Sequence, residues 1–364
     1  MRSYILRRLM LMVPTLLGIM VINFFVIQAA PGGPVEQMLS QLKGRGDVTA
    51  RFTGGDNSGA GAPSTAGVEQ GSMSRGGRGL PPELVERIRK QYGFDKPIGE
   101  RFLKMMSGYL TFDLGESLFR NARVSDLVIS KLPVSISLGI WTTLLVYLIS
   151  IPLGIAKAVR DGTRFDVSTS TTLIVLNAIP GFLFALLLVV LFAGGSYFKW
   201  FPLRGLVSDD WYSLGLVDKM LDYFWHMALP IGAMVIGGFA TLTFLTKNSF
   251  LEEIHKQYVL TARAKGLIER RVLYGHVFRN AMLIVIAGFP AAFIGVLFTG
   301  SLLIEVIFSL DGIGLLGFEA ALNRDYPIMF GTLYFFGLIG LVMGILGDLM
   351  YTVIDPRIDF EARA

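Results

Sequence analysis

The chain has 364 residues, of which 52% are hydrophobic and only 17% are charged, and its formal net charge is +5. Its mean hydropathy of +0.57 lies outside the range of ordinary soluble domains, so that class of protein is excluded. With no cysteine and three histidines, the chain has no disulfide and lacks the side chains for a cysteine-based metal centre.

Six apolar stretches are each about 20 residues long, the length that a helix needs to cross the hydrocarbon core of a bilayer. They fall at about 9–29, 134–156, 173–194, 227–246, 280–304 and 329–354. In lipid every backbone polar group has to be paired, and these stretches are too long and too evenly apolar for barrel strands. The sequence therefore predicts an all-α integral membrane protein with six transmembrane helices.

The N-terminal segment, residues 1–30, contains the first of these helices behind a basic start, MRSYILRR. A cleaved signal peptide has the same charge pattern, but its apolar core is shorter than this one. We therefore expect a retained helix, with Arg2, Arg7 and Arg8 keeping the N-terminus in the cytoplasm.

Residues 31–133 form the one long segment of soluble character, and we expect it on the periplasmic side. Within it, about residues 44–79 are so rich in glycine and serine that they cannot bury a core. They include GDNSGAGAPST, which imitates a phosphate-binding loop, but Pro63 stands where such a loop needs a lysine. About residues 80–130 have helical periodicity and predict a small helical cap. Its two apolar faces comprise Leu84, Ile88 and Tyr92, and Phe102, Met105, Met106 and Tyr109.

Residues 134–355 hold the other five helices, and the basic residues between them set the orientation. Lys157, Arg160 and Arg164 follow the second helix, and seven more basic residues follow the fourth: Lys247, Lys256, Arg263, Lys265, Arg270, Arg271 and Arg279. By the positive-inside rule both loops are cytoplasmic, and so is the tail, residues 356–364. This asymmetry and the anionic lipid of the inner leaflet account for the net charge, so no nucleic-acid partner is needed.

Several residues inside the predicted helices are expected to be structural. Prolines at Pro14, Pro152, Pro180, Pro230 and Pro290 predict kinks. Glycines at Gly337, Gly340, Gly344 and Gly347 predict a close-packed stripe. Asp348 lies deep enough to need a partner, on a neighbouring helix or near Arg279.

The sequence offers little for chemistry. No H-E-x-x-H, G-x-S-x-G or G-x-x-x-x-G-K-[ST] pattern is present, so we expect no catalytic, cofactor-binding or metal-ligating residue. If the protein pumps, another subunit has to supply the energy. A secondary transporter is an alternative, although its equipment would be thin: Asn23 and Asn177 lie well inside a helix, and Asp348 lies nearer one end. An exporter or channel subunit of the same topology is a further alternative.

The largest cytoplasmic loop, about residues 247–279, is strongly basic and is expected to form two short helices with a break at Gly266. Val259 and Ala262 line one side of the first helix, and Ile268 and Val272 one side of the second. Spacing alone fits a helix lying on lipid headgroups as well as a helix that docks on a partner.

Within this loop, QYVLTARAKGLIERRVLYGHVFRNA resembles the EAA loop of permease subunits in ABC importers of the oligopeptide and dipeptide branch. The resemblance covers nearly the whole chain outside the glycine-rich insertion. Its motifs are RRLMLMVPTLLGIMVINFFVIQAAPGGP, QYGFDKPIGERF, FDLGESLF, IPLGIAKAVRDGTRFD, SLLIEVIFSLDGIGLL, NRDYP and YTVIDPRIDF.

The resemblance implies a subunit of the bacterial inner membrane that forms a translocation path with a second, related permease. A separate cytoplasmic ATPase would bind ATP and Mg²⁺, and a periplasmic binding protein would deliver oligopeptides or peptide-like compounds such as microcin C. It also implies that a coupling helix contacts the ATPase through Thr261, Ala262, Arg263, Ala264, Lys265, Gly266 and Arg270.

Two positions depart from the family pattern. Ile268 replaces a serine or aspartate that often caps the second loop helix. Asp311-Gly312-Ile313-Gly314 replaces the usual Pro-Gly-x-Gly, so an identical turn is not expected there.

Overall fold

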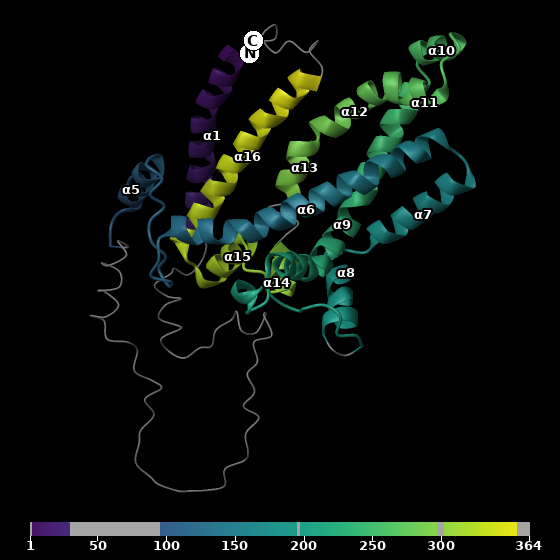
Figure 1. Cartoon of the computed structure of the whole chain (residues 1–364). Helices are drawn as coiled ribbons and strands as arrows, with labels where there is room; N and C mark the ends of the chain where they lie inside the picture. Colours follow the sequence, from purple (N-terminus) through teal and green to yellow (C-terminus); the bar gives the residue numbers. More distant parts are fainter. Residues whose placement is uncertain (1, 30–94, 195–196, 297–301, 355–364) are drawn as a thin grey trace. The chain divides into compact units, whose positions relative to one another are not determined.

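The computed structural model describes residues 2–29, 95–194, 197–296 and 302–354 (Figure 1). The chain forms two compact units. The first comprises Met1–Ile19, Ile129–Leu316 and Leu333–Ala364, and the second comprises Met20–Val128 and Gly317–Thr332. The predicted glycine-rich insertion, the Leu84, Ile88 and Tyr92 face of the cap and the C-terminal tail lie outside the described residues.

Helices account for nearly all of the regular structure. In chain order they are α1 (Arg2–Ala29), α5 (Ile98–Leu110), α6 (Val124–Val159), α7 (Arg164–Ala178), α8 (Gly181–Leu188), η2 (Val189–Ala193), η3 (Trp211–Ser213), α9 (Leu216–Ile254), α10 (Gln257–Ala264), α11 (Glu269–Val272), η4 (Leu273–Val277), α12 (Phe278–Ala287), α13 (Phe289–Gly295), α14 (Leu302–Ile307), α15 (Ile313–Asn323) and α16 (Tyr326–Ile354). Within the described ranges the only strand-like pairing is one antiparallel bridge between Glu116 and Arg123.

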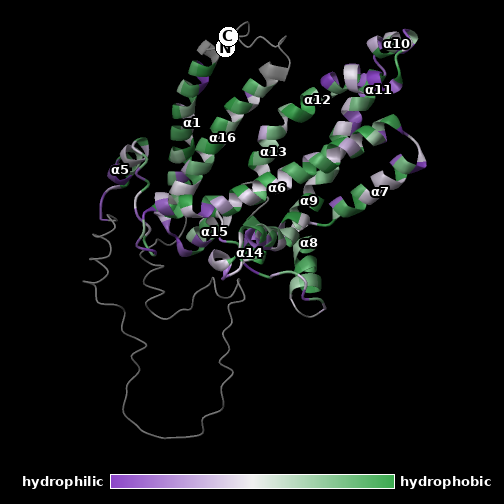
Figure 2. Cartoon of the chain, in the orientation of Figure 1, coloured by the Kyte–Doolittle hydropathy of each residue, from purple (hydrophilic) through white to green (hydrophobic). Residues whose placement is uncertain are grey.

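Five helices are long and apolar enough to cross a membrane, and the number rises to six if the bent pair α7 and α8 forms one span. Figure 2 shows the hydrophobic colour running along α1, α6, α9 and α16. The predicted fold class, an all-α protein with membrane-spanning helices, is confirmed.

The third predicted span is not one straight helix. Its two halves are bent by 86° at a break around Ile179 and Pro180. Proline has no N–H to donate and disfavours a helical backbone in the residue before it. Ile179 accordingly has an extended backbone, with φ −86° and ψ 119°.

The other prolines do not break their helices. Pro14, Pro152 and Pro230 lie inside the continuous helices α1, α6 and α9. Pro290 lies in the first turn of α13, a position where the missing N–H is tolerated because it would have no helical acceptor.

Lys157 and Lys247, both predicted to lie in loops, belong to the long helices instead. Helix α6 extends to Val159, so Lys157 lies in its last turn and is buried. Helix α9 extends to Ile254, so Lys247 is also helical. Hydropathy marks only the lipid-crossing part of a helix, and paired charges allow the helix to continue beyond it.

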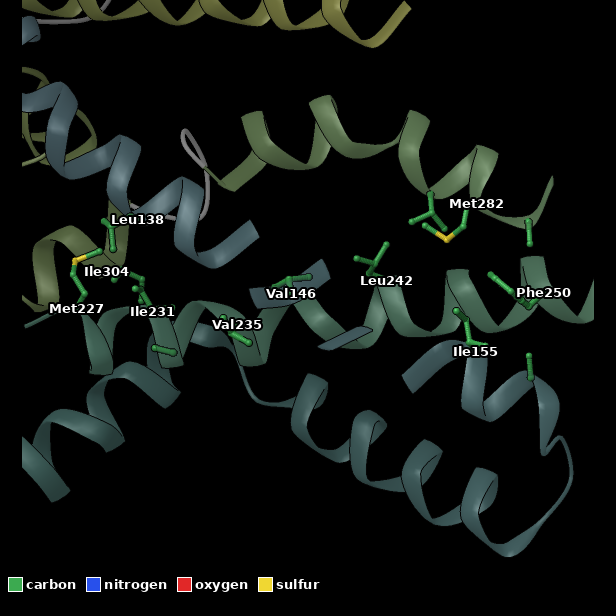
Figure 3. Close-up of a cluster of buried hydrophobic side chains, with 14 of the residues drawn as sticks. Leu138, Val146, Ile155, Met227, Ile231, Val235, Leu242, Phe250, Met282 and Ile304 are labelled. Carbon is green, nitrogen blue, oxygen red and sulfur yellow. The ribbon is translucent and has the colours of Figure 1, made fainter. Parts of the chain in front are cut away.

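The core of the first unit lies along the crossing of α6 and α9. Leu138, Val146 and Ile155 of α6 pack with α9 residues from Met227 to Phe250, joined by Met282 of α12 and Ile304 of α14 (Figure 3). The two long helices lie in close contact at Gly154, where an added Cβ would lie 2.6 Å from Cβ of Thr246.

The first unit also gives Asp348 its partner. Asp348 Oδ2 lies 2.8 Å from a guanidinium nitrogen of Arg8 on α1. Its partner therefore comes from a neighbouring helix and is not Arg279. The glycine stripe on α16 packs closely only at two of its positions. A Cβ on Gly337 would lie 3.2 Å from Leu16, and one on Gly347 would lie 3.2 Å from Pro290.

The Asp311–Gly314 turn covers a buried carboxylate. Glu305 is fully buried and accepts hydrogen bonds from Ser135 Oγ at 2.9 Å and from the Leu315 backbone N–H at 2.8 Å, at the start of α15. A Cβ on Gly312 would lie 2.4 Å from the Glu305 carboxyl carbon. A side chain at this position would therefore displace the hydrogen-bonded Glu305 carboxylate.

In the second unit, α5 presents the predicted Phe102 to Tyr109 face, with Tyr109 buried. Phe102 and Phe330 each pack against Phe24, with ring centroids 5.2 and 5.7 Å from its ring. Asp325 accepts a 2.5 Å hydrogen bond from Ser117 Oγ, which links NRDYP to FDLGESLF. Burial raises the pKa of Asp325, although the hydrogen bonds that it accepts from Ser117 and from backbone N–H groups act in the opposite direction.

Candidate functional site

The candidate site is the segment from α10 to α11, here called the basic loop (residues 257–272), which directly follows the long helix α9. Figure 1 shows it beyond the end of α9, and Figure 2 shows hydrophilic residues gathered there. The predicted pair of short helices is present.

The break between the two helices lies at Gly266, as predicted. Its φ is +79°, in the left-handed region that glycine adopts without a Cβ penalty. The Gly266 N–H donates to Arg263 O at 2.9 Å, and the Leu267 N–H donates to Ala262 O at 3.3 Å. These two bonds form a Schellman motif, which satisfies carbonyls left over at the end of α10.

One side of the basic loop packs against the helical core. Val259, Ala262 and Val272 are buried, as the spacing predicted. The prediction for Ile268 is wrong, because its side chain is 71% exposed. Ile268 is the N-cap of α11 and has an extended backbone, which takes its side chain off the helical face; no side chain caps this helix start.

The other side of the loop is exposed and carries most of the candidate contact residues. Thr261, Arg263 and Ala264 lie on α10 with exposed side chains. Lys265 ends α10, and Arg270 lies exposed on α11. Ala262 is the exception, since it faces the core.

The exposed face combines charge with apolar area. Arg263 Nε lies 2.9 Å from Glu269 Oε1, which ties the two loop helices together. Leu260 and Ile268 are 50% and 71% exposed and flank the charged groups. A face of this composition suits a protein partner better than water alone, because it exposes large apolar side chains beside directional charges.

A polar cluster around the buried Glu253 side chain anchors the base of the loop. Glu253, in the last turn of α9, accepts hydrogen bonds from Lys256 and from Tyr258 Oη, the latter at 2.6 Å. Asn280 of α12 donates to Tyr258 Oη at 3.2 Å. The cluster therefore joins the end of α9, the start of α10 and the start of α12.

The anchoring contacts also perturb two ionisable groups of the loop. The hydrogen bond to Glu253 raises the pKa of Lys256, which favours the charged ammonium. Burial raises the pKa of Tyr258, and its hydrogen bond to Glu253 acts in the same direction.

The sequence analysis missed Glu253, Tyr258 and Asn280. The spacing of Glu253 and Lys256, three residues apart at a helix end, is a weak signal for a pair. Nothing in the sequence indicates the contact from Asn280, which is 22 residues from Tyr258. Among the described residues there is no group of three or more His, Cys, Asp or Glu side chains that is placed to hold a metal ion.

Residues 150–360, which include α9, the basic loop and α16, match the family described as the inner membrane component of binding-protein-dependent transport systems. The chain belongs to this family. The prediction of a multi-pass protein of the inner membrane is thereby confirmed.

Relatives of this family member match it from end to end. The peptidoglycan transport system permease protein YejB of Agrobacterium fabrum is 62% identical over 364 residues, covering 100% of both chains. The inner membrane ABC transporter permease protein YejB of Escherichia coli O157:H7 is 58% identical with the same coverage. The oligopeptide transport system permease protein OppB of Salmonella typhimurium is 31% identical over 361 residues, covering 99% of this chain and 100% of its own. The resemblance to the oligopeptide branch is confirmed.

Among solved structures, an inward-facing MetNI methionine ABC transporter is similar with a TM-score of 0.49 and 13% identity. The similarity covers 63% of this chain and 96% of that one.

Proposed function

We propose that the protein is the permease subunit of an ATP-driven ABC importer for oligopeptides and peptide-like compounds. Similarity to the YejB permeases supports this proposal, and the name of the Agrobacterium relative, a peptidoglycan transport system permease, adds peptidoglycan fragments to the microcin C type of substrate. The observation that carries the proposal is the basic loop, whose exposed face is available to a partner while its other face is locked to the helices.

The proposed assembly has four kinds of subunit. This chain forms the translocation path with a second, YejE-like permease. A YejF-like ATPase in the cytoplasm binds ATP and Mg²⁺ and receives the basic loop, and a YejA-like periplasmic protein delivers the peptide. The chain itself contributes no catalytic residue, and both of its termini lie in the cytoplasm, as the distribution of basic residues favours.

In this assembly the basic loop transmits movement of the ATPase to the membrane helices. Movement of the ATPase displaces α10, and the Glu253 cluster passes the displacement to α9 and α12 together. A loop joined to the bundle only by flexible chain would absorb such a movement. The hydrogen bonds favour a stiff connection, because breaking them would leave the buried Glu253 carboxylate unpaired.

Co-purification of the tagged chain from its native membrane tests the proposal. We expect a second permease and an ATPase in the purified complex, and ATP-dependent uptake of a labelled oligopeptide after reconstitution with the binding protein. Recovery of a lone homodimer that carries peptide on a proton gradient would refute the proposal in favour of a secondary transporter.

A further inference from the structure

The end of α6 holds a lysine whose side chain is fully buried, Lys157. Its ammonium donates to the Asp166 carbonyl at 2.9 Å, to Thr169 Oγ1 at 2.8 Å and to Ser170 Oγ at 2.7 Å. An ammonium has three N–H groups, so its donors are fully used. All three acceptors lie in the first turns of α7, and Lys157 therefore fastens α6 and α7 into one hairpin.

A second lysine joins this hairpin to α9. Lys247 Nζ lies 2.7 Å from Asp166 Oδ2 and 2.8 Å from Asp161 Oδ1. Asp166 is thus shared, because its other carboxylate oxygen lies 3.0 Å from Lys157 Nζ. We call these four residues the lysine joint. Two ammonium groups face two carboxylates, so the charges of the joint are balanced.

Close packing supports the same connection. One turn from the joint, a Cβ on Gly154 of α6 would lie 2.6 Å from Thr246 Cβ and 2.8 Å from the Thr243 carbonyl oxygen of α9. The two backbones are therefore in contact with no intervening side chain on α6. Because no side chain lies between the two backbones, none can change its conformation to absorb a displacement. The two helices therefore either move together or separate.

The joint lies between the basic loop and a cavity in the membrane-spanning region. Lys247 is seven residues before Ile254, about 10 Å along α9, and α10 begins three residues later. On the other side, α7 leads through the break at Pro180 into α8. The first residues of α8, Gly181 and Phe182, border a cavity of about 460 Å³ that α9, α13 and α14 also line.

On the basis of the proposed ATP-driven function, we propose that Lys247 is a positioning residue for coupling. Its two ion pairs pass the position of the basic loop from α9 to the α6–α7 hairpin, and through α7 to the broken helix beside the cavity. Lys157 has a different role, since it holds the hairpin itself together. Removing Lys247 therefore leaves the loop able to engage the ATPase but takes away the ionic connection from α9 to α7, so that only packing still joins these helices.

The first test compares uptake with ATP hydrolysis in the complete reconstituted complex. In Lys247→Met, Asp166 keeps its contact with Lys157, so we expect the complex to assemble. Peptide uptake per ATP hydrolysed falls by about tenfold, which corresponds to a loss of about 1.4 kcal/mol of coupling free energy. ATPase stimulation by the binding protein stays within about twofold of native. Lys247→Arg restores the ratio, because a guanidinium reaches both carboxylates.

Lys219→Met is the matched control, since it makes the same change on α9, 28 residues before the joint. We expect Lys219→Met to leave the ratio of peptide uptake to ATP hydrolysis unchanged. If Lys247→Met does not assemble, Asp161→Asn replaces it, because it breaks only the half-exposed arm of the joint. An assembled Lys247→Met or Asp161→Asn complex with the native uptake-to-ATP ratio overturns the proposal.

The second test measures the connection directly. The chain has no cysteine, so Gln257→Cys on α10 and Val167→Cys on α7, both at exposed side chains, accept a pair of spin labels with no background from this chain. In otherwise native complex we expect one narrow distance distribution that is the same with and without ATP. In Lys247→Met the distribution broadens when ATP is added. An unchanged narrow distribution in that variant overturns the proposal.

The two proposals fail in different ways. If the chain is not part of an ATP-driven importer, native complex shows no ATP-dependent uptake at all. If only the role of Lys247 is wrong, native complex takes up peptide with ATP and the variants match it in both tests.

Discussion

Replacing Gly266 by valine tests the basic loop with a purely local change. A Cβ at this position would meet no atom within 4 Å, so the substitution makes no clash. Its whole cost comes from the backbone, because φ is +79°. Placing an L-residue in the left-handed region costs roughly 1–2 kcal/mol, and a β-branched side chain lies at the upper end.

We expect this strain to open the Schellman motif and to reduce the fraction of loops ready to dock. A cost of about 1.4 kcal/mol lowers the ratio of docking-ready to open loops by about tenfold and weakens the apparent affinity by up to the same factor. The assay is titration of the ATPase subunit into reconstituted permease pairs, with binding-protein-stimulated hydrolysis and peptide uptake as readouts. The half-maximal ATPase concentration rises in Gly266→Val, by up to about tenfold.

Two variants serve as controls for the valine substitution. Gly266→Asn has a smaller effect, because asparagine tolerates the left-handed region. Gly275→Ala, in the adjacent π-helix where φ is not positive, leaves the titration unchanged. A Gly266→Val complex with native affinity for the ATPase and native uptake would show that the loop conformation is not what the ATPase recognises.

Three further predictions follow from other contacts. Asp348→Asn retains hydrogen bonding to Arg8 and transports nearly normally, whereas Asp348→Leu impairs assembly; a dead but assembled Asn variant, with native uptake that an uncoupler abolishes at constant ATP, would contradict this structural role. Gly312→Ala pushes a Cβ into the buried carboxylate beneath it and lowers thermal stability by about 1–3 kcal/mol, while Gly340→Ala, with open space, serves as its control. Because pairing raises the pKa of Lys256, its contribution to loop stability is complete below the ordinary lysine pKa of 10.5 and is lost as pH rises through the raised value. A spin label on α10 should gain mobility in that range, and Lys256→Gln should show no such step.

Local features of the chain were predictable because their causes are local. Apolar runs of membrane length are read directly from composition, and they gave the spanning helices apart from the bend at Pro180. The break at Gly266 followed from backbone preference, and the burial of Val259 and Val272 followed from helical spacing. The family resemblance added the role expected of the loop, which neither composition nor spacing provides.

The partners of the buried charges were decided only by the tertiary structure. In sequence, Lys157 and Lys247 looked like two more basic residues of cytoplasmic loops, yet both pair with Asp166. Lys247 is 81 positions away from Asp166 along the chain. Arg8 and Asp348 come from the first and last helices of the described chain. An ion pair forms only within a few ångströms, whereas hydropathy and periodicity describe one helix at a time. Which lysine stays in solvent and which is buried depends on the helices that packing brings beside it.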